Sequence, residues 1–411
     1  MTVPRTSGWP SGMDSMKTRP LAGIRVLDVS AYISGPYAAS LLASLGAEVI
    51  KLEPPEGEAF RIGKGTGNPF FAQYNAGKKS IAVDLKAREG IEIVKAMLPG
   101  IDVLIENMRP GKMASLGLGP EDCQSINPRL VYASVSGFGN GGPWVDRPAY
   151  DSIGQALGGF YTLMNDPDDV RLTGTCLADL ISSVNVAFGV VATLLGRERD
   201  SSGRGARVET SVFEAVSTLT IDAMTQALTA NIDPQRDTRH PLAQNFCLRT
   251  ASHDYIVLHL SSSQKFWQSL MRAVGREEVA SDPLFLAYAD RATPGRLAMI
   301  KALLEEEFLK LPREEWERRL IEADVPFAPA LTMREVAAHP QMKWLGILGA
   351  VAGGRTVIDP PWRFDGKRPR RTAHVPEIGE HSREVLSEFL EPAVLEDLQA
   401  RGIVGTRSVA T

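Results

Sequence analysis

A single carboxylate stands at the start of a long uncharged segment and raises the question of its chemistry. Asp179 lies in "VRLTGTCLADLISSVNVAFGVVATLLGRER" (170–199), and no charged residue follows it until Arg197. Asp is a preferred helix N-cap, since its side-chain oxygen accepts hydrogen bonds from the first backbone N–H groups. The same donors stabilise an ionised carboxylate, and an ionised, partly desolvated carboxylate is a nucleophile. The stretch predicts a helix capped by Asp179 and leaves two roles open, a cap alone or a cap that is also a nucleophile.

Cations gather in segments that read as loops after predicted strands. Lys86, Arg109 and Arg61 lie in "VDLK", "ENMRPG" and "KLEPPEGEAFR". Arg and Lys side chains bind phosphate oxygens through charge-assisted hydrogen bonds, so these three are candidate partners of a phosphorylated ligand. The glycines of "GFGNGG" (137–142) do not match the GxGxxG spacing of dinucleotide-binding loops and are typical of a plain turn.

The elements that position these side chains alternate between strand and helix. Apolar runs rich in β-branched residues predict strands at 23–30, 48–53, 79–85, 102–107 and 130–138. Helices are predicted at 35–47, with Pro36 in its first turn and Gly46 at its C′ position, and at 86–98. This alternation favours an α/β fold with a parallel sheet covered on both faces. Ligands bind such sheets at the carboxyl ends of the strands, where the cation-bearing loops lie.

Composition excludes several classes of protein. The 411 residues include 45 Lys and Arg against 49 Asp and Glu, a net charge of −4, which argues against a general binder of nucleic acid or acidic membranes. Three cysteines without CxxC spacing and six histidines without metal-ligand spacing predict neither disulfides nor a metal site. The polar N-terminus lacks the apolar core of a signal peptide, which favours a cytoplasmic protein. The apolar run after Asp179 favours a buried core helix, because a membrane span needs about 20 apolar residues.

The chain changes character near Asp233. The polar stretch "DPQRDTRHP" is typical of a linker, and amphipathic helical patterns follow it. We predict a flexible tail at 1–20, a large domain at 21–232 and 346–411, and a small α+β domain at 233–345. The segment "AVAGGRTVIDPPWRFDG" is interpreted as the return to the large domain.

Several motifs, in order, resemble the class III CoA-transferases, which include formyl-CoA transferase, carnitine CoA-transferase and α-methylacyl-CoA racemase. The motifs span nearly the whole chain after residue 20 and include "LAGIRVLDVS", "GPYAASLLASLGAEVIKLEPPEG", "NAGKKSIAVDLK", "DVLIENMRPGKMASLGLG", "RPAYDSIGQALGG" and "IGEHSREVLSEF". The resemblance implies a Rossmann-like large domain built from both chain ends and an interlocked homodimer.

The resemblance also implies roles for particular residues. The family's nucleophilic aspartate falls on Asp179. Tyr150 and Asp151 line the approach to it. The positions that contact CoA fall on Ile33, Ser34, Val83, Asp84, Leu85, Lys86, Asn107, Met108 and Arg109.

These matches imply an acyl-CoA:carboxylate CoA-transferase with a covalent aspartyl-CoA intermediate. Acyl-CoA and a small carboxylic acid would be its substrates, CoA would be a substrate rather than a resident cofactor, and no nucleic-acid, membrane or metal partner is expected. Backbone N–H groups around 137–142 are candidates for oxyanion stabilisation.

The chain departs from the family at several places. Formyl-CoA transferase has a glutamine where this chain has Ile33, and a glycine-rich gating loop that "HPLAQNFC" (240–247) lacks, which argues against formyl-CoA and oxalate. Many members have an arginine at the position of Ser115. The racemase branch has a His before its Asp, whereas this chain has Tyr150 before Asp151. An isomerase that abstracts an α-proton is the alternative activity, and a CoA-binding protein without chemistry is a third hypothesis.

Overall fold

The computed structural model describes residues 19–61, 68–236, 244–260, 263–351, 353–371 and 373–405. The chain divides into two compact units, one of residues 1–162, 169–221 and 343–411 and the other of residues 163–168 and 222–342. The predicted tail at 1–20 lies almost entirely outside the described residues. The domain bounds inferred from sequence, with a small domain at 233–345, remain a prediction.

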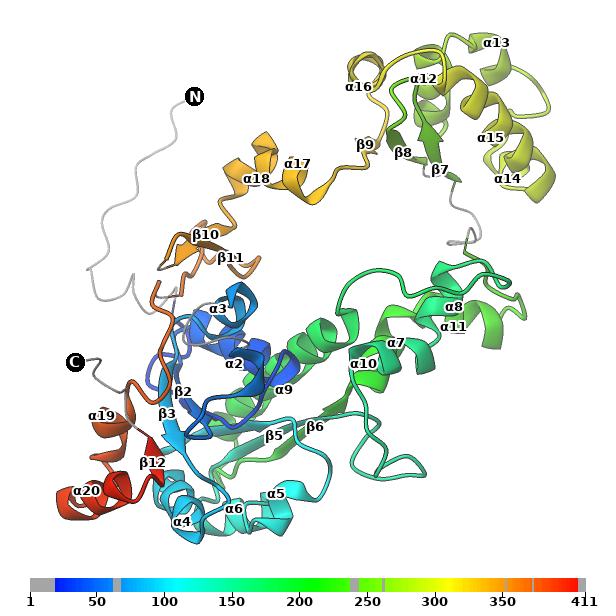
Figure 1. Ribbon diagram of the computed structural model, residues 1–411. Coiled ribbons are helices and arrows are strands. Elements are labelled where there is room, and N and C mark those ends of the chain that lie inside the picture. Colours follow the sequence, from blue (N-terminus) through cyan, green and yellow to red (C-terminus); the bar gives the residue numbers. More distant parts are fainter. Residues whose placement is uncertain are drawn as a thin grey trace. The chain divides into compact units, whose positions relative to one another are not determined.

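A seven-stranded sheet forms the centre of the first unit (Figure 1). Its strands are β1 (Arg25–Asp28), β2 (Glu48–Glu53), β3 (Lys79–Val83), β4 (Val103–Glu106), β5 (Val131–Ser136), β6 (Arg207–Ser211) and β12 (Val404–Gly405). Their order is β12-β3-β2-β1-β4-β5-β6. All neighbouring pairs are parallel except β12, which pairs antiparallel with β3. The predicted α/β class with a parallel sheet is therefore confirmed, and the antiparallel edge strand is an addition to it.

Helices cover both faces of this sheet. One apolar cluster joins the strands to α4 (Arg88–Met97), α6 (Pro120–Ile126), α19 (Ser382–Leu386) and α20 (Pro392–Ala400). The other joins them to α2 (Ser34–Ser44), α9 (Leu177–Arg199) and α10 (Val212–Leu219). Because both faces are covered, the central strands read as continuous apolar runs in the sequence.

The remaining elements of the first unit are short. They are η1 (Ala59–Arg61), α3 (Pro69–Asn75), η2 (Leu98–Gly100), α5 (Lys112–Ser115), α7 (Asp151–Leu157), and the hairpin of β10 (Leu348–Val351) and β11 (Arg355–Ile358). Three helices cross the borders between the units, α8 (Phe160–Met164), α11 (Ile221–Leu228) and α18 (Pro340–Leu345).

The first helix ends as its sequence predicts. Leu45 is the C-cap of α2, and Gly46 follows it with φ of +103°. A residue with a Cβ is strained at that backbone angle, which explains the glycine at C′.

The longest helix, α9, packs one side against the sheet. Its buried residues include Ser182, Ser183, Val186 and Val190. It contacts α2, α10, β5 and β6. Among the described residues, α9 is also the one helix whose length and apolar composition would suffice to cross a membrane, and such a helix is equally typical of a protein core.

The second unit has a three-stranded antiparallel sheet of β7 (Gln244–Arg249), β8 (Tyr255–Leu260) and β9 (Phe327–Pro329). Its helices are α12 (Gln264–Ala273), α13 (Glu277–Ala280), α14 (Tyr288–Arg291), α15 (Pro294–Phe308), α16 (Arg313–Glu322) and α17 (Met333–Ala338). Its own core includes the stacked pair Phe308 and Trp316, whose ring centroids are 4.3 Å apart.

Candidate active site

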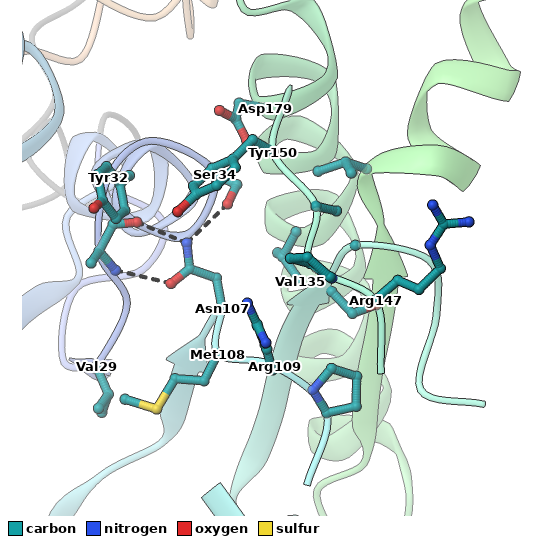
Figure 2. A pocket seen from close by; sticks show the side chains of 17 residues that line it. Val29, Tyr32, Ser34, Asn107, Met108, Arg109, Val135, Arg147, Tyr150 and Asp179 are labelled. Atoms are coloured by element: carbon teal, nitrogen blue, oxygen red, sulfur yellow. Dashed lines mark hydrogen bonds between the residues drawn. The ribbon is translucent and has the colours of Figure 1, made fainter. Parts of the chain in front are cut away.

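The order of the strands creates a crevice beside β1. The chain runs outward from β1 to β3 and then returns to β4 on the other side of β1. The loops after β1 and β4 therefore leave the sheet in opposite directions, and ligands of doubly wound sheets bind between such loops. A cavity of about 280 Å³ lies there. Its wall is formed by the ends of β1, β4 and β5, the loop before α7, and the starts of α9 and α10 (Figure 2).

Asn107 ties the two diverging loops together. Its Oδ1 accepts the N–H of Ala31 at 2.9 Å, and its Nδ2 donates to the Ala31 carbonyl at 2.8 Å and to Ser34 Oγ at 3.1 Å (Figure 2). All five polar atoms belong to residues that line the cavity. This amide fixes the floor of the crevice.

Asp179 reaches the cavity from the first turn of α9, but it does not cap the helix. The N-cap residue is Cys176, and Asp179 lies three residues further on. The capping carboxylate is Asp151, whose Oδ1 accepts the N–H groups of Ala178 at 2.8 Å and of Asp179 at 3.2 Å. The predicted cap at Asp179 was therefore wrong, because a carboxylate from α7 takes that role.

The consequence is a partly buried carboxylate with a raised pKa. Burial, and secondarily the charge of Asp151, raise the pKa of Asp179 to about 7. The backbone N–H groups that would stabilise an ionised Asp179 as a cap donate to Asp151 instead. Asp179 therefore changes charge near neutral pH and does not stay fully ionised as the sequence suggested.

The cavity joins several of the residues that the sequence singled out. Ser34, Asn107, Met108, Arg109, Tyr150 and Asp179 line it together. The Arg109 guanidinium has no hydrogen-bond or ion-pair partner among the described residues, so its charge is available to a ligand.

Other predicted residues lie near this edge without lining the cavity. Ile33 is the N-cap of α2, and Asp151 begins α7. Val83 ends β3, and Asp84, Leu85 and Lys86 follow it at the carboxyl edge of the sheet. The Asp84 side chain accepts the Lys86 N–H at 2.9 Å, which shapes this turn.

Arg61 has a different environment from the one expected of a phosphate partner. Only 3% of it is exposed, and its guanidinium donates two hydrogen bonds of 2.6 Å to the Glu53 carboxylate and one to the Pro376 carbonyl. It also lies 3.9 Å from the centre of the Phe71 ring. In this arrangement Arg61 holds buried structure together and does not face the cavity.

Two departures from the family can be located. Ser115 ends α5, where its hydroxyl donates to the Lys112 carbonyl at 2.7 Å. In "HPLAQNFC", residues 240–243 lie outside the described residues, and residues 244–247 belong to β7.

Sequence reasoning missed several side chains of the cavity wall, among them Tyr32 and Arg147. Arg147 lies with its guanidinium 3.9 Å from the centre of the Trp144 ring. Tyr32 has φ of +65°, which few residues other than glycine adopt. No sequence signal marked Tyr32, whereas the cation in "DRPAYD" could have been noted as a further charged residue beside Tyr150.

A family model for "CoA-transferase family III" matches residues 21–382. The chain belongs to CoA-transferase family III. The resemblance drawn from the motifs is thereby confirmed, and the protein is a CoA-transferase of this class.

Named relatives have the same kind of activity with different acids. The chain is 34% identical to an acetyl-CoA:oxalate CoA-transferase of Acetobacter aceti, over 91% of this chain and 96% of that protein. It is 31% identical to a succinyl-CoA–D-citramalate CoA-transferase of Chloroflexus aurantiacus, over 94% of this chain and 98% of that protein.

Solved structures share the fold. A hypothetical protein from Mycobacterium tuberculosis superimposes with a TM-score of 0.80 at 32% identity, covering 90% of this chain and 99% of that one. A CaiB/BaiF family protein from Brucella suis has a TM-score of 0.79 at 28% identity, covering 91% of this chain and all of that one.

Proposed function

We propose that this CoA-transferase moves CoA from an acyl-CoA to a carboxylic acid through a covalent aspartyl-CoA intermediate on Asp179. The observation that supports the proposal is the single cavity that Asp179 shares with Asn107, Met108 and Arg109. A CoA thioester bound by its phosphates at the strand ends would reach Asp179 with its acyl end.

Four displacements complete the reaction. An Asp179 oxygen attacks the thioester carbonyl and the C–S bond breaks. CoA thiolate departs, and a mixed anhydride between Asp179 and the acyl group remains. The thiolate attacks the aspartyl carbonyl and releases the donor acid, which leaves an aspartyl-CoA thioester. The acceptor carboxylate attacks that thioester and expels the thiolate, forming a second anhydride. The thiolate then attacks the acceptor's acyl carbonyl, so the new acyl-CoA forms and the Asp179 carboxylate is regenerated. Each step exchanges one bond to a carbonyl carbon for another, and no proton is gained or lost overall.

The loop after β5 is the candidate for stabilising the oxyanions of these steps. Gly137 lines the cavity, and a Cβ added to it would lie 2.5 Å from Ala149 Cβ. Glycine at 137 therefore lets the segment before α7 approach closely. Backbone N–H groups here would act as preorganised donors to a developing negative charge.

The cavity wall favours transfer over isomerisation. An isomerase that epimerises an α-carbon needs an acid and a base on opposite faces of that carbon. Among the described residues that line the cavity, Asp179 is the only carboxylate, and there is no histidine. A nucleophilic role needs one carboxylate, whereas proton transfer on two faces needs a second group.

Trapping of the intermediate tests the proposal. Incubation with a panel of acyl-CoA esters, followed by borohydride or hydroxylamine, should modify Asp179, as seen by peptide mass mapping. Asp179→Ala should be unmodified and should lose transfer. Full transfer by Asp179→Ala would exclude the mechanism. Exchange of the substrate α-proton with deuterated solvent, without transfer to an acceptor, would instead establish the isomerase.

The resemblance to interlocked dimers leads us to propose a homodimer as well. Val184, Phe188 and Leu195 lie on one side of α9, and their exposed fractions are 41%, 76% and 51%. Exposed apolar patches of this kind are typical of protein–protein interfaces. We expect light scattering to give twice the mass of one chain at micromolar concentration, and Phe188→Glu to lower that mass. A monomeric parent chain would contradict the dimer.

A further inference from the structure

Aromatic rings form a connected row beside the cavity of Asp179. Tyr150 and Tyr32, which both line the cavity, meet edge to face with centroids 6.3 Å apart. Tyr32 lies 5.8 Å from Phe60, and Phe60 lies 6.4 Å from Phe70. These four residues, which we call the aromatic wall, come from three separate segments. Their contacts are therefore a property of the folded site and not of one apolar run in the sequence.

The wall presents apolar surface that the described chain leaves uncovered. The exposed fractions are 68% for Tyr150, 61% for Phe70 and 43% for Tyr32. Large aromatic side chains are usually buried. Two of this group, Tyr32 and Tyr150, line the same cavity as Asp179, and exposed aromatic rings at a cavity are typical of a ligand contact.

Tyr32 occupies its place in the wall at a conformational penalty. Its φ of +65° lies in the left-handed region, which is unfavourable for a bulky residue and persists only when the surroundings enforce it. The Glu58 Oε2 atom accepts the Tyr32 N–H at 3.1 Å, and Asn107 holds both main-chain polar groups of the preceding Ala31. The backbone is thus held on both sides of the strained residue.

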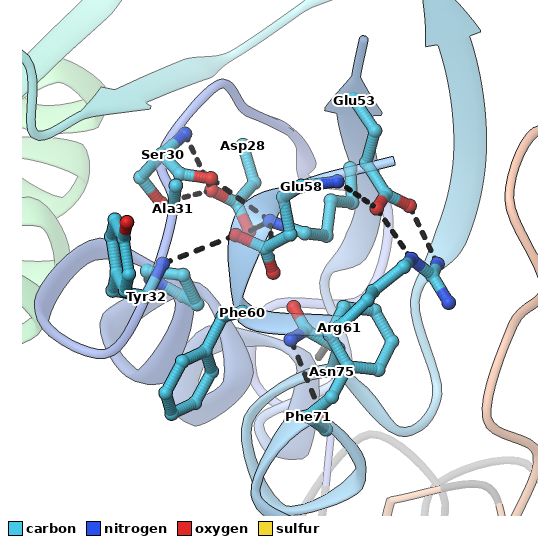
Figure 3. A network of polar contacts seen from close by, with 12 residues as sticks. Asp28, Ser30, Ala31, Tyr32, Glu53, Glu58, Phe60, Arg61, Phe71 and Asn75 are labelled. Carbon is cyan, nitrogen blue, oxygen red and sulfur yellow. Dashed lines mark hydrogen bonds and ion pairs between the residues drawn. The ribbon is translucent and has the colours of Figure 1, made fainter. Parts of the chain in front are cut away.

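Glu58 is itself fixed by buried charges (Figure 3). Lys51 Nζ lies 3.4 Å from Glu58 Oε1 and donates to the Ser30 carbonyl at 2.9 Å. Lys51 is fully buried, and only 7% of Glu58 is exposed. Moving a buried charge away from its partner is unfavourable, so this pair keeps the acceptor for Tyr32 in place. A strained, rigidly held ring at a reactive site indicates a functional requirement for that ring.

We propose, resting on the function proposed above, that the aromatic wall selects acids whose carboxylate is attached to an aryl body. Such a body would meet the rings edge to face, while its carboxylate or thioester carbon lies at Asp179. The wall's four side chains offer no positive charge to a second carboxylate. The two cations that line the cavity, Arg109 and Arg147, lie outside the wall. A second carboxylate placed against the rings would therefore be desolvated there without a partner, which is unfavourable. This class differs from the oxalate and succinate named for relatives.

Self-exchange with isotopically labelled acids tests the proposal, because donor and acceptor are then the same acid. Phenylacetyl-CoA with labelled phenylacetate is compared with succinyl-CoA and labelled succinate, read by mass spectrometry of the CoA esters. We expect kcat/KM of the parent chain to be about tenfold higher for the aryl pair, the upper range of an aromatic contact. A higher value for succinate would overturn the selectivity while leaving CoA transfer intact.

Two variants of Tyr32 separate the ring from its backbone. Tyr32→Gly removes the ring and accepts the positive φ without strain, so it should lower the aryl-to-succinate ratio about fivefold to tenfold, mainly through KM of the aryl pair. Tyr32→Phe keeps the ring and should keep the ratio. An equal loss for both pairs in Tyr32→Gly would mean that the ring contacts the CoA arm common to both, and would overturn the proposal.

The failure of the underlying function has a different signature. If neither ester exchanges, and Asp179 is not modified by any acyl-CoA of the trapping panel, the transferase mechanism fails and the inference fails with it. If Asp179 is trapped by succinyl-CoA and not by phenylacetyl-CoA, only the inference fails.

Discussion

The Asp151 carboxylate accepts the backbone N–H groups of Ala178 and Asp179, at 2.8 Å and 3.2 Å, and thereby caps the helix that carries Asp179. A third hydrogen bond, donated by Gln155 Nε2, is accepted by Asp151 Oδ2. The same carboxylate contributes its charge to the raised pKa of Asp179. One side chain therefore both caps the helix that carries Asp179 and makes the ionisation of Asp179 less favourable.

Removing the charge of Asp151 should shift the pH dependence of catalysis. In the proposed mechanism Asp179 attacks in its ionised form, so kcat/KM of the parent chain should rise with pH through about 7. In Asp151→Asn the side-chain oxygen still accepts hydrogen bonds, but the charge is gone. We expect the rise to move to lower pH, measured as pH profiles of CoA transfer.

Asp200→Asn is the matched control, since Asp200 is exposed at the other end of α9. Its profile should coincide with that of the parent. A profile of Asp151→Asn that also coincides with the parent would mean that Asp151 does not act on Asp179 through its charge.

The raised pKa of Asp179 also predicts a pH-dependent change in stability. The protonated form is favoured in the folded state, so ionisation opposes folding once the pH exceeds the ordinary pKa of 3.8. This penalty should grow as pH rises to about 7 and then level off, at up to about 4 kcal/mol. Asp179→Asn lacks this penalty. Its free energy of unfolding should be higher than that of the parent at pH 8 and similar to it near pH 4. Denaturant titrations at both pH values measure the difference, and a constant difference between them would argue against the raised pKa.

Binding of the CoA phosphates should depend on cations at the carboxyl edge of the sheet. Arg109 lines the cavity and has no hydrogen-bond or ion-pair partner in the described part of the chain, and Lys86 follows β3 at the same edge. We expect Arg109→Ala and Lys86→Ala each to weaken CoA binding by about 1.5–3 kcal/mol, the range of a charge-assisted hydrogen bond. The salt dependence of CoA binding should be smaller in both variants than in the parent, because screening acts on partly exposed charge pairs.

Lys95→Ala serves as the control for this measurement, because Lys95 lies on α4 and pairs with Glu92. Titration calorimetry at two salt concentrations gives both the affinity for CoA and its salt dependence. Unchanged binding in both Arg109→Ala and Lys86→Ala would place the phosphates elsewhere.

Much of the first unit follows from local sequence patterns. The run "EVIKLE" corresponds residue for residue to β2, Glu48–Glu53. Parallel strands buried on both faces read as apolar runs, and the strand ends then locate the ligand edge. The strand ends thus indicated Arg109 as a ligand contact, whereas Asn107 and Asp179 were assigned to the same site through the family resemblance.

Contacts between distant residues account for what the sequence could not predict. The cap of α9 comes from Asp151, 28 positions before Asp179, so a rule based on adjacent residues assigned it to Asp179. A cation in a loop resembles a phosphate ligand, and only the folded chain places Arg61 against Glu53. The short edge strand β12, Val404–Gly405, has too few residues to show a period.

The buried charges beneath the aromatic wall should contribute strongly to stability. Lys78 is fully buried, and its Nζ donates to Asp28 Oδ2 at 2.7 Å, to the Pro36 carbonyl at 2.8 Å and to Asn75 Oδ1 at 2.8 Å. In Lys78→Met, Asp28 keeps the hydrogen bonds from Ser30, and the positive charge left beside it among the described residues is Lys51, whose Nζ lies 3.9 Å away.

Breaking one partner of a buried ion pair costs about 3–5 kcal/mol, because the remaining charge stays buried. We therefore expect Lys78→Met to lower the free energy of unfolding by that amount. Lys95→Met removes the same charge from the surface pair with Glu92, whose N–O distance is 3.1 Å, and should cost about 0–1 kcal/mol. Urea titrations of both variants at pH 7 measure the contrast. Equal, small losses would mean that solvent reaches Asp28 and that the network does not hold the loop of Tyr32 rigidly.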